Sequence, residues 1–104
     1  MLTYHLVPRE EFDSDAAEYR PAGFAAEGFI HTTRDPALLA EVGNRYYRAD
    51  PRPYLVLIIE LDRVRAPWRY DAAGEEYPHI YGARNRDAIV GVRPAVRGDD
   101  GTFR

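Results

Sequence analysis

Short apolar stretches along the chain predict several β-strands. Residues 2–7 and 29–31 are brief stretches of this kind, and residues 54–61 form a nearly continuous apolar run that is partly β-branched. An apolar run of strand length is typical of a central strand that is covered on both faces. Further short strands are expected at residues 68–70, 76–81 and 88–92.

Two helices are expected in the first half of the chain. The first opens at Pro8, which suits a first helical turn, and it ends before a break at residues 20–23. The second covers residues 36–48, where leucine, valine and tyrosine recur at helical spacing after the capping residue Asp35. The order of strand, helix, strand, helix and then four strands predicts an α+β fold with a mostly antiparallel sheet.

Length bounds the domain organisation. A chain of 104 residues can build one domain with one core and is too short for two. We expect this domain to cover residues 1–96, followed by a polar tail at residues 97–104 that frays. The sequence has no apolar run of about 18 residues and shows no secretory signal, so we expect no membrane span and a cytoplasmic location.

The amino-acid composition excludes several kinds of catalytic and metal-binding site. All 14 basic residues are arginine, and the chain has neither lysine nor cysteine. It therefore cannot form a Schiff base, use a P-loop lysine, build a thiolate zinc site or use a cysteine nucleophile. The net charge of −3 implies no broad electropositive face, so nucleic acid is disfavoured as the main partner.

The three histidines all lie in strand-like segments rather than in polar loops. They are His5, His31 and His79. An imidazole both donates and accepts hydrogen bonds, so it is costly to bury without partners. Either all three are satisfied structural histidines, or strands that are distant in sequence bring them together at one pocket. Their spacings of 26 and 48 residues match no compact ligand motif, so we expect no metal site.

Two of these histidines lie in more informative motifs. His31 is followed by Thr32 at the entrance to the expected second helix, where unpaired N–H groups suit an anion or where the hydroxyl caps the helix. Alternation places Tyr77, His79 and Tyr81 on one face of their strand. Such a row can hold a flat ring such as nicotinamide or adenine, or it can belong to the core.

His5 is less informative. Its neighbour Tyr4 points to the opposite side of the strand, so only one of the two can face a given pocket. The sequence does not decide which of them does.

These same segments resemble a family of small bacterial and plant proteins, the domain of unknown function numbered 952. The resemblance covers nearly the whole chain, and its most specific pieces are Gly-Phe-Ile-His at residues 28–31 and Pro-His-Ile-Tyr-Gly at residues 78–82. The other matching segments are residues 4–12, 44–48, 55–62 and 87–90.

The resemblance implies a fold similar to that of ADP-ribosyltransferases, in which a split sheet surrounds a cleft that binds NAD. On this basis the ligand-binding residues are His5, His31, Thr32, His79 and Tyr81. The implied ligand is NAD, ADP-ribose or a related nucleotide. His5 and His31 would hold ribose hydroxyls or phosphate, and Tyr81 would stack on the base. If the chain is an enzyme, the implied reaction is transfer or hydrolysis at the N-glycosidic bond.

The chain departs from this pattern in its acidic residues. The resemblance places the third motif of the fold at residues 79–81. Many members of the fold carry a catalytic glutamate on the strand of this motif, whereas Glu75 and Glu76 here precede it. The histidine-rich pattern is more similar to the branch that removes an RNA 2′-phosphate with NAD. A non-catalytic binding module, or a protein-interaction domain with structural histidines, therefore stays an alternative. Arg84 and Arg86 after the motif would meet a diphosphate or simply solvate a turn.

Overall fold

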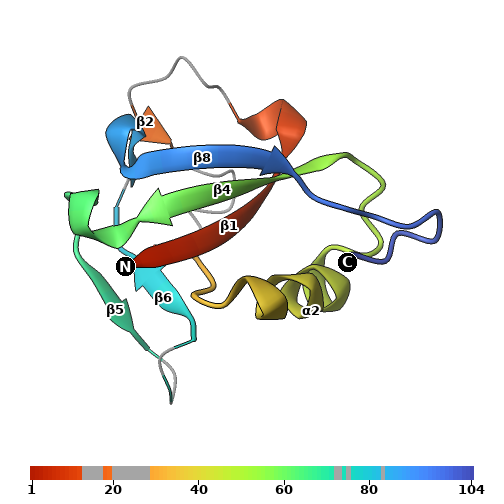
Figure 1. Ribbon diagram of the computed structural model, residues 1–104, viewed down its shortest axis with the longest axis horizontal. Coiled ribbons are helices and arrows are strands. Elements are labelled where there is room, and N and C mark those ends of the chain that lie inside the picture. Colours follow the sequence, from red (N-terminus) through yellow and green to blue (C-terminus); the bar gives the residue numbers. More distant parts are fainter. Residues whose placement is uncertain (13–17, 20–28, 72–73, 75, 83) are drawn as a thin grey trace.

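In the residues that the computed structural model describes, one α-helix, two small three-stranded antiparallel sheets and a two-stranded sheet build an α+β fold (Figure 1). The structure describes residues 1–12, 18–19, 29–71, 74, 76–82 and 84–104, and of residues 18, 19 and 84 only the backbone. The strands and the helix, in chain order, are β1 (Leu2–Pro8), β2 (Glu18–Tyr19), β3 (Ile30–His31), α2 (Pro36–Tyr46), β4 (Tyr54–Glu60), β5 (Trp68–Tyr70), β6 (Pro78–Ile80), β7 (Arg84–Asn85) and β8 (Ile89–Pro94). No helix in the described part of the chain is long and apolar enough to cross a membrane.

The first sheet has the strand order β1–β4–β8, and all its strands are antiparallel. The apolar run at residues 54–61 therefore forms the central strand, as its pattern predicts. One face of β4 buries Leu57 in a cluster of aliphatic side chains. The other face packs Val56 against Leu39 of α2. Covering both faces explains why the strand tolerates almost no polar residue before Glu60.

The second sheet has the strand order β3–β6–β5. Its inner face buries Ile30 and Ile80, which pair directly across β3 and β6 and pack against Trp68. The two sheets meet where Tyr4 of β1 exchanges two backbone hydrogen bonds, each of 2.8 Å, with Thr33 just after β3. This junction brings β1 and its histidine next to the second sheet.

The prediction of a first helix opening at Pro8 is wrong for the described residues. Residues 9–11 make a single 3-10 turn, Phe12 is already extended, and residues 18–19 pair as β2 with β7. The interior of the expected helix, residues 13–17, lies outside the described residues. The N–H of Arg9 donates to the carbonyl of Pro53 at 2.9 Å, so the chain here is tied to the start of β4. The fold thus has one described α-helix instead of two early ones, and α2 ends two residues sooner than predicted.

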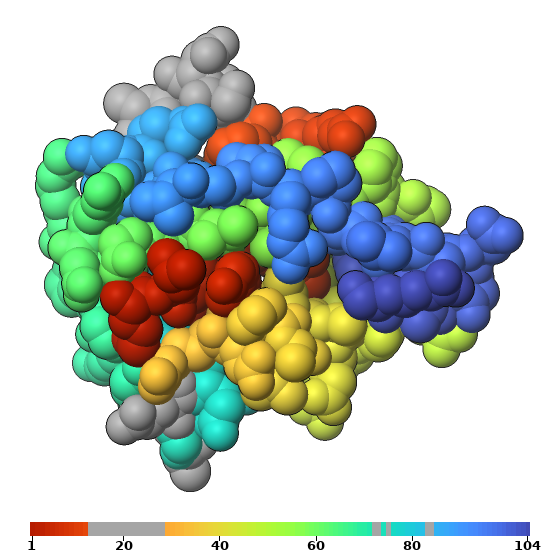
Figure 2. Space-filling view, in the orientation of Figure 1, coloured from red at the N-terminus to blue at the C-terminus, as the bar shows by residue number. Residues whose placement is uncertain are grey.

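The C-terminal residues 97–104, for which the sequence predicts a frayed tail, fold back onto α2 instead. Phe103 is only 4% exposed and packs in the same core as Leu39. Its backbone N–H donates to Asn44 Oδ1 at 2.6 Å, and its carbonyl accepts from Asn44 Nδ2 at 3.1 Å. Figure 2 shows these residues in dark blue beside the yellow surface of α2. Phe103, the contacts of Asn44 and the side chain of Arg97 together hold this polar stretch.

Candidate functional site

His31 and His79 lie in contact, although 48 residues separate them in the sequence. They are direct cross-strand partners in β3 and β6, and their ring centroids are 4.9 Å apart in an edge-to-face arrangement. Phe29 stacks on His79 with a centroid distance of 4.3 Å, and Tyr81 lies 5.4 Å from Phe29. We call these four residues the aromatic cluster. It lies on the outer face of the second sheet, opposite the buried Ile30 and Ile80.

A carboxylate holds the polar atoms of the aromatic cluster in place. Asp71, just after β5, has its Oδ2 at 2.8 Å from Nδ1 of His79, and the Tyr81 hydroxyl donates to the same oxygen. Nε of Arg69 donates to the other oxygen, Oδ1, at 2.7 Å. The hydrogen bond from His79, followed by that from Arg69, holds the pKa of Asp71 below its usual range. An ionised carboxylate only accepts, so His79 carries hydrogen on Nδ1 and presents Nε2 as its other polar position.

Arg69 completes this face. It is the direct cross-strand partner of His79 on β5, and its guanidinium carbon lies 4.4 Å from the centroid of the Tyr81 ring. Neither Arg69 nor Asp71 is indicated by the sequence, because only the pairing of β5 with β6 places them beside His79. The sequence alone could have indicated Phe29, because alternation along residues 29–31 puts its side chain on the same face as that of His31.

His5 is placed differently from the other two histidines. It is 7% exposed, and its Nδ1 lies 2.7 Å from the carbonyl oxygen of His31. The imidazole thus contacts the backbone that carries His31 and links β1 to β3. Tyr4, its neighbour, faces the α2 side of the first sheet, so alternation along the strand is as the sequence predicts.

Thr32 is 2% exposed, and its hydroxyl is engaged on both sides. Oγ1 donates to the carbonyl of Pro78 at 2.6 Å and accepts from the Thr3 hydroxyl at 2.8 Å. The N-cap of α2 is Asp35, whose Oδ1 accepts from the N–H of Ala37 at 2.9 Å, as its position before Pro36 predicts. A carboxylate therefore already occupies the helix N-terminus at which the sequence suggested an anion.

Two of the charged residues that flank the third motif, Arg86 and Glu76, have side chains that the structure describes. Arg86 has its guanidinium 5.7 Å from the ring centroid of Phe12, and the side chain of Arg84 lies outside the described residues. Glu76 is exposed, and its backbone carbonyl accepts from the N–H of Arg34 at 2.7 Å, while Glu75 lies outside the described residues. Within the described ranges, no three metal-ligating side chains come together.

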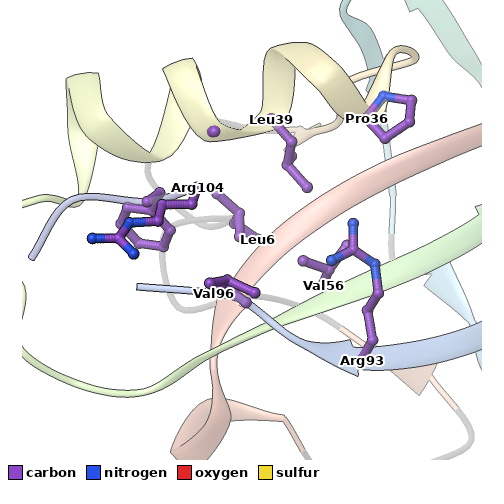
Figure 3. A pocket seen from close by; sticks show the side chains of 10 residues that line it. Leu6, Pro36, Leu39, Val56, Arg93, Val96 and Arg104 are labelled. Carbon is purple, nitrogen blue, oxygen red and sulfur yellow. The ribbon is translucent and has the colours of Figure 1, made fainter. Parts of the chain in front are cut away.

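A small cavity lies elsewhere, between α2 and the first sheet (Figure 3). Leu39 points into it from α2, and Leu6 and Val56 face it from β1 and β4. Its volume of about 30 Å³ holds two or three water molecules, since one water needs roughly 10–15 Å³ on the same measure. This cavity cannot accept a nucleotide, and its lining includes no member of the aromatic cluster.

Comparisons with known proteins show which family and fold this arrangement belongs to. The family model described as "Protein of unknown function (DUF952)" matches residues 6–92. The uncharacterized proteins Rv1354c of Mycobacterium tuberculosis and Mb1389c of Mycobacterium bovis are each 36% identical over 64 residues, which is 60% of this chain. The chain spans only about a tenth of the length of these relatives, the matched part being 10% of each.

Solved structures of protein CC0527 from Caulobacter crescentus share the fold. The crystal structure of CC0527 has a TM-score of 0.79 and is 20% identical in sequence. The aligned part covers 100% of this chain and 94% of the CC0527 chain. The solution structure has a TM-score of 0.71 and is 22% identical in sequence. The aligned part covers 96% of this chain and 89% of the CC0527 chain. At such low identity the similarity extends to the fold alone.

Proposed function

The chain belongs to the DUF952 family of proteins of unknown function, and from this premise we propose that it binds a nucleotide such as NAD or ADP-ribose on the outer face of the second sheet. In this proposal the two sheets form an ADP-ribosyltransferase-like fold, and His31, His79 and Tyr81 contact the ligand. The observation that carries the proposal is the meeting of His31 and His79 among aromatic rings. Strands 48 residues apart in sequence supply the two imidazoles.

The chemistry of the aromatic cluster matches the two parts of a nucleoside. A nicotinamide or adenine ring stacks favourably on an aromatic side chain such as Tyr81 or Phe29. Imidazoles donate to or accept from ribose hydroxyls, and in the proposal the exposed His31 and Nε2 of His79 make these contacts. His5 and Thr32 take a supporting role in the proposal, because both are buried and hold the backbone around His31.

Catalysis is a second candidate function, and the Asp71–His79 pair is the observation that favours it. A carboxylate that fixes Nδ1 of an imidazole leaves Nε2 as a general base. In N-glycosidic hydrolysis of NAD, Nε2 of His79 would take a proton from water as the water oxygen bonds to the ribose C1′. The bond from C1′ to nicotinamide would break, and nicotinamide would leave with the bonding electrons. This chemistry would not need the glutamate that the third motif lacks.

The direct test of binding is titration with NAD and with ADP-ribose, followed by calorimetry and by amide chemical shifts. We expect chemical-shift changes confined to β3, β5, β6 and the residues next to these strands, and loss of binding in His31→Ala and His79→Ala. Tyr46→Ala is the control, because Tyr46 is an exposed aromatic residue on α2, away from the aromatic cluster. No response at millimolar ligand would overturn the proposal. If both histidine variants melt at lower temperature but bind the ligand as the unmodified protein does, the role of the two histidines is structural.

The direct test of catalysis is release of nicotinamide from NAD, measured by chromatography. We expect release by the unmodified protein and its loss in Asp71→Asn and His79→Ala. Binding of NAD without any release would leave a non-catalytic binding module.

A further inference from the structure

Three side chains capable of positive charge form a row across the second sheet. His79 on β6 pairs directly with His31 on β3 on one side and with Arg69 on β5 on the other. The neighbouring row, in which Ile30, Ile80 and Trp68 pair in the same way, faces the core. Because successive side chains of a strand point to opposite faces, the row with the histidines faces outward.

Asp71 ties two members of this row together. One oxygen of its carboxylate accepts from Nε of Arg69 and the other contacts Nδ1 of His79. The pairing of Arg69 uses only one of the five N–H groups of the guanidinium. Within the part of the chain that the structure describes, no acceptor lies within hydrogen-bonding distance of its Nη atoms, and the side chain is 69% exposed.

Two other arginines, Arg97 and Arg52, use their Nη atoms differently. Arg97 donates through Nη1 and Nη2 to backbone carbonyls of residues 47, 48, 50, 52 and 101, and Arg52 donates to three carboxylates. Both are therefore committed to structural contacts. Arg69, in contrast, is oriented through Nε and by the ring of Tyr81, with its Nη groups in solvent.

We propose that Arg69 binds the phosphate groups of the ligand, which makes the ligand a phosphorylated nucleotide rather than a nucleoside. This inference rests on the proposed function and deepens it. A guanidinium held by one N–H presents the others as a fork that matches phosphate oxygens. The negative charge of Asp71 is offset by Arg69, whose Nε–H donates to Oδ1 of that carboxylate. The base would then lie over Tyr81 and Phe29 and the diphosphate toward β5.

The experiment compares phosphate-bearing and phosphate-free probes by calorimetry. Inorganic pyrophosphate, ADP-ribose, adenosine and nicotinamide riboside are titrated into the unmodified protein, Arg69→Gln and Arg65→Gln. Arg65 is a matched control, because it is also an exposed arginine paired with one aspartate, Asp87 at 3.1 Å. We expect Arg69→Gln to weaken ADP-ribose and pyrophosphate about tenfold or more, as for loss of a hydrogen bond to a charged group. The nucleosides should bind equally well to all three proteins.

The outcomes separate this inference from the proposed function. If Arg69→Gln binds ADP-ribose like the unmodified protein, the role of Arg69 is overturned while nucleotide binding stands. If pyrophosphate binds through Arg69 but neither the nucleosides nor ADP-ribose bind, the anion site stands and the nucleotide proposal fails. Arg69→Lys guards against a folding artefact, because it keeps the charge but loses the fork, and we expect intermediate affinity. Equal affinity of Arg69→Lys and the unmodified protein would overturn the bidentate contact.

Discussion

The imidazole of His5 reaches the backbone of His31, with its Nδ1 2.7 Å from the carbonyl oxygen of that residue. This contact joins β1 of the first sheet to β3 of the second, close to the backbone pair between Tyr4 and Thr33. His5 is buried, whereas the side chain of His31 is on the exposed face. Two histidines that look equivalent in the sequence therefore contribute in different ways.

Replacing His5 should affect stability first. We expect His5→Ala to lower the free energy of unfolding by about 1–3 kcal/mol, because the His31 carbonyl loses a donor in a partly buried setting. Urea denaturation measures the change. His5→Asn is the control, since its amide nitrogen can replace Nδ1 and should restore part of the loss. Unchanged stability of His5→Ala would show that this contact does not hold the two sheets together.

Much of the fold could be predicted from local patterns. The central strand at residues 54–60 and the helix from Pro36 are marked by an apolar run and by a capping residue followed by proline. The helix expected from Pro8 failed because its apolar stripe was partial and the pairing of β2 with β7 joins residues far apart in sequence. The packing of the C-terminal residues was not indicated for a related reason. The contacts that hold Phe103 against α2 also join residues far apart in sequence.

The sequence likewise indicates some residues of the candidate site and misses others. The motifs around His31 and His79 could be recognised, because each combines a histidine with aromatic residues in a short segment. Asp71 and Arg69 could not, because they approach His79 only through the register of β5 on β6. A register between two short strands is not encoded by either strand alone.

Thr32 offers a test of whether its hydroxyl is structural. Thr32→Val keeps the shape of the side chain but removes the donor to Pro78 and the acceptor for Thr3. We expect a loss of about 1–3 kcal/mol in the free energy of unfolding, because both partners lie in a buried setting. Thr32→Ser retains the hydroxyl and should lose less. If Thr32→Val keeps the native stability but no longer binds the ligand, Thr32 contacts the ligand directly and its role is not structural.

Phe103 tests the packing of the C-terminal residues. Its ring lies so close to α2 that a side chain at Gly43 would clash with it, a Cβ there being 2.5 Å from Phe103 Cγ. We expect Phe103→Ala to cost about 3–5 kcal/mol, since it removes a buried aromatic side chain from the core. Val96→Ala is the matched control just before these residues, because Val96 is 56% exposed. Equal melting temperatures of the two variants would mean that the C-terminal residues do not contribute to the core.

Asp71 should make the aromatic cluster sensitive to acid. Its hydrogen bonds, first with His79 and then with Arg69, hold its pKa below the usual value of 3.8. A carboxyl group whose pKa is lowered on folding stabilises the protein above the unfolded-state pKa, and this contribution is lost as the pH falls through the folded-state pKa. The difference in unfolding free energy between the unmodified protein and Asp71→Asn should therefore be largest near neutral pH and shrink below about pH 4.

The same carboxyl group can be followed directly by NMR titration of its side-chain carbon. In His79→Ala the largest cause of the lowered pKa is removed, so the midpoint of Asp71 should move up toward 3.8. Arg65→Gln should leave it unchanged, because Arg65 pairs with Asp87 instead. If the midpoint is the same with and without His79, the hydrogen bond from Arg69 alone accounts for the shift. The imidazole would then not be oriented by Asp71, and the case for His79 as a general base would lose its physical basis.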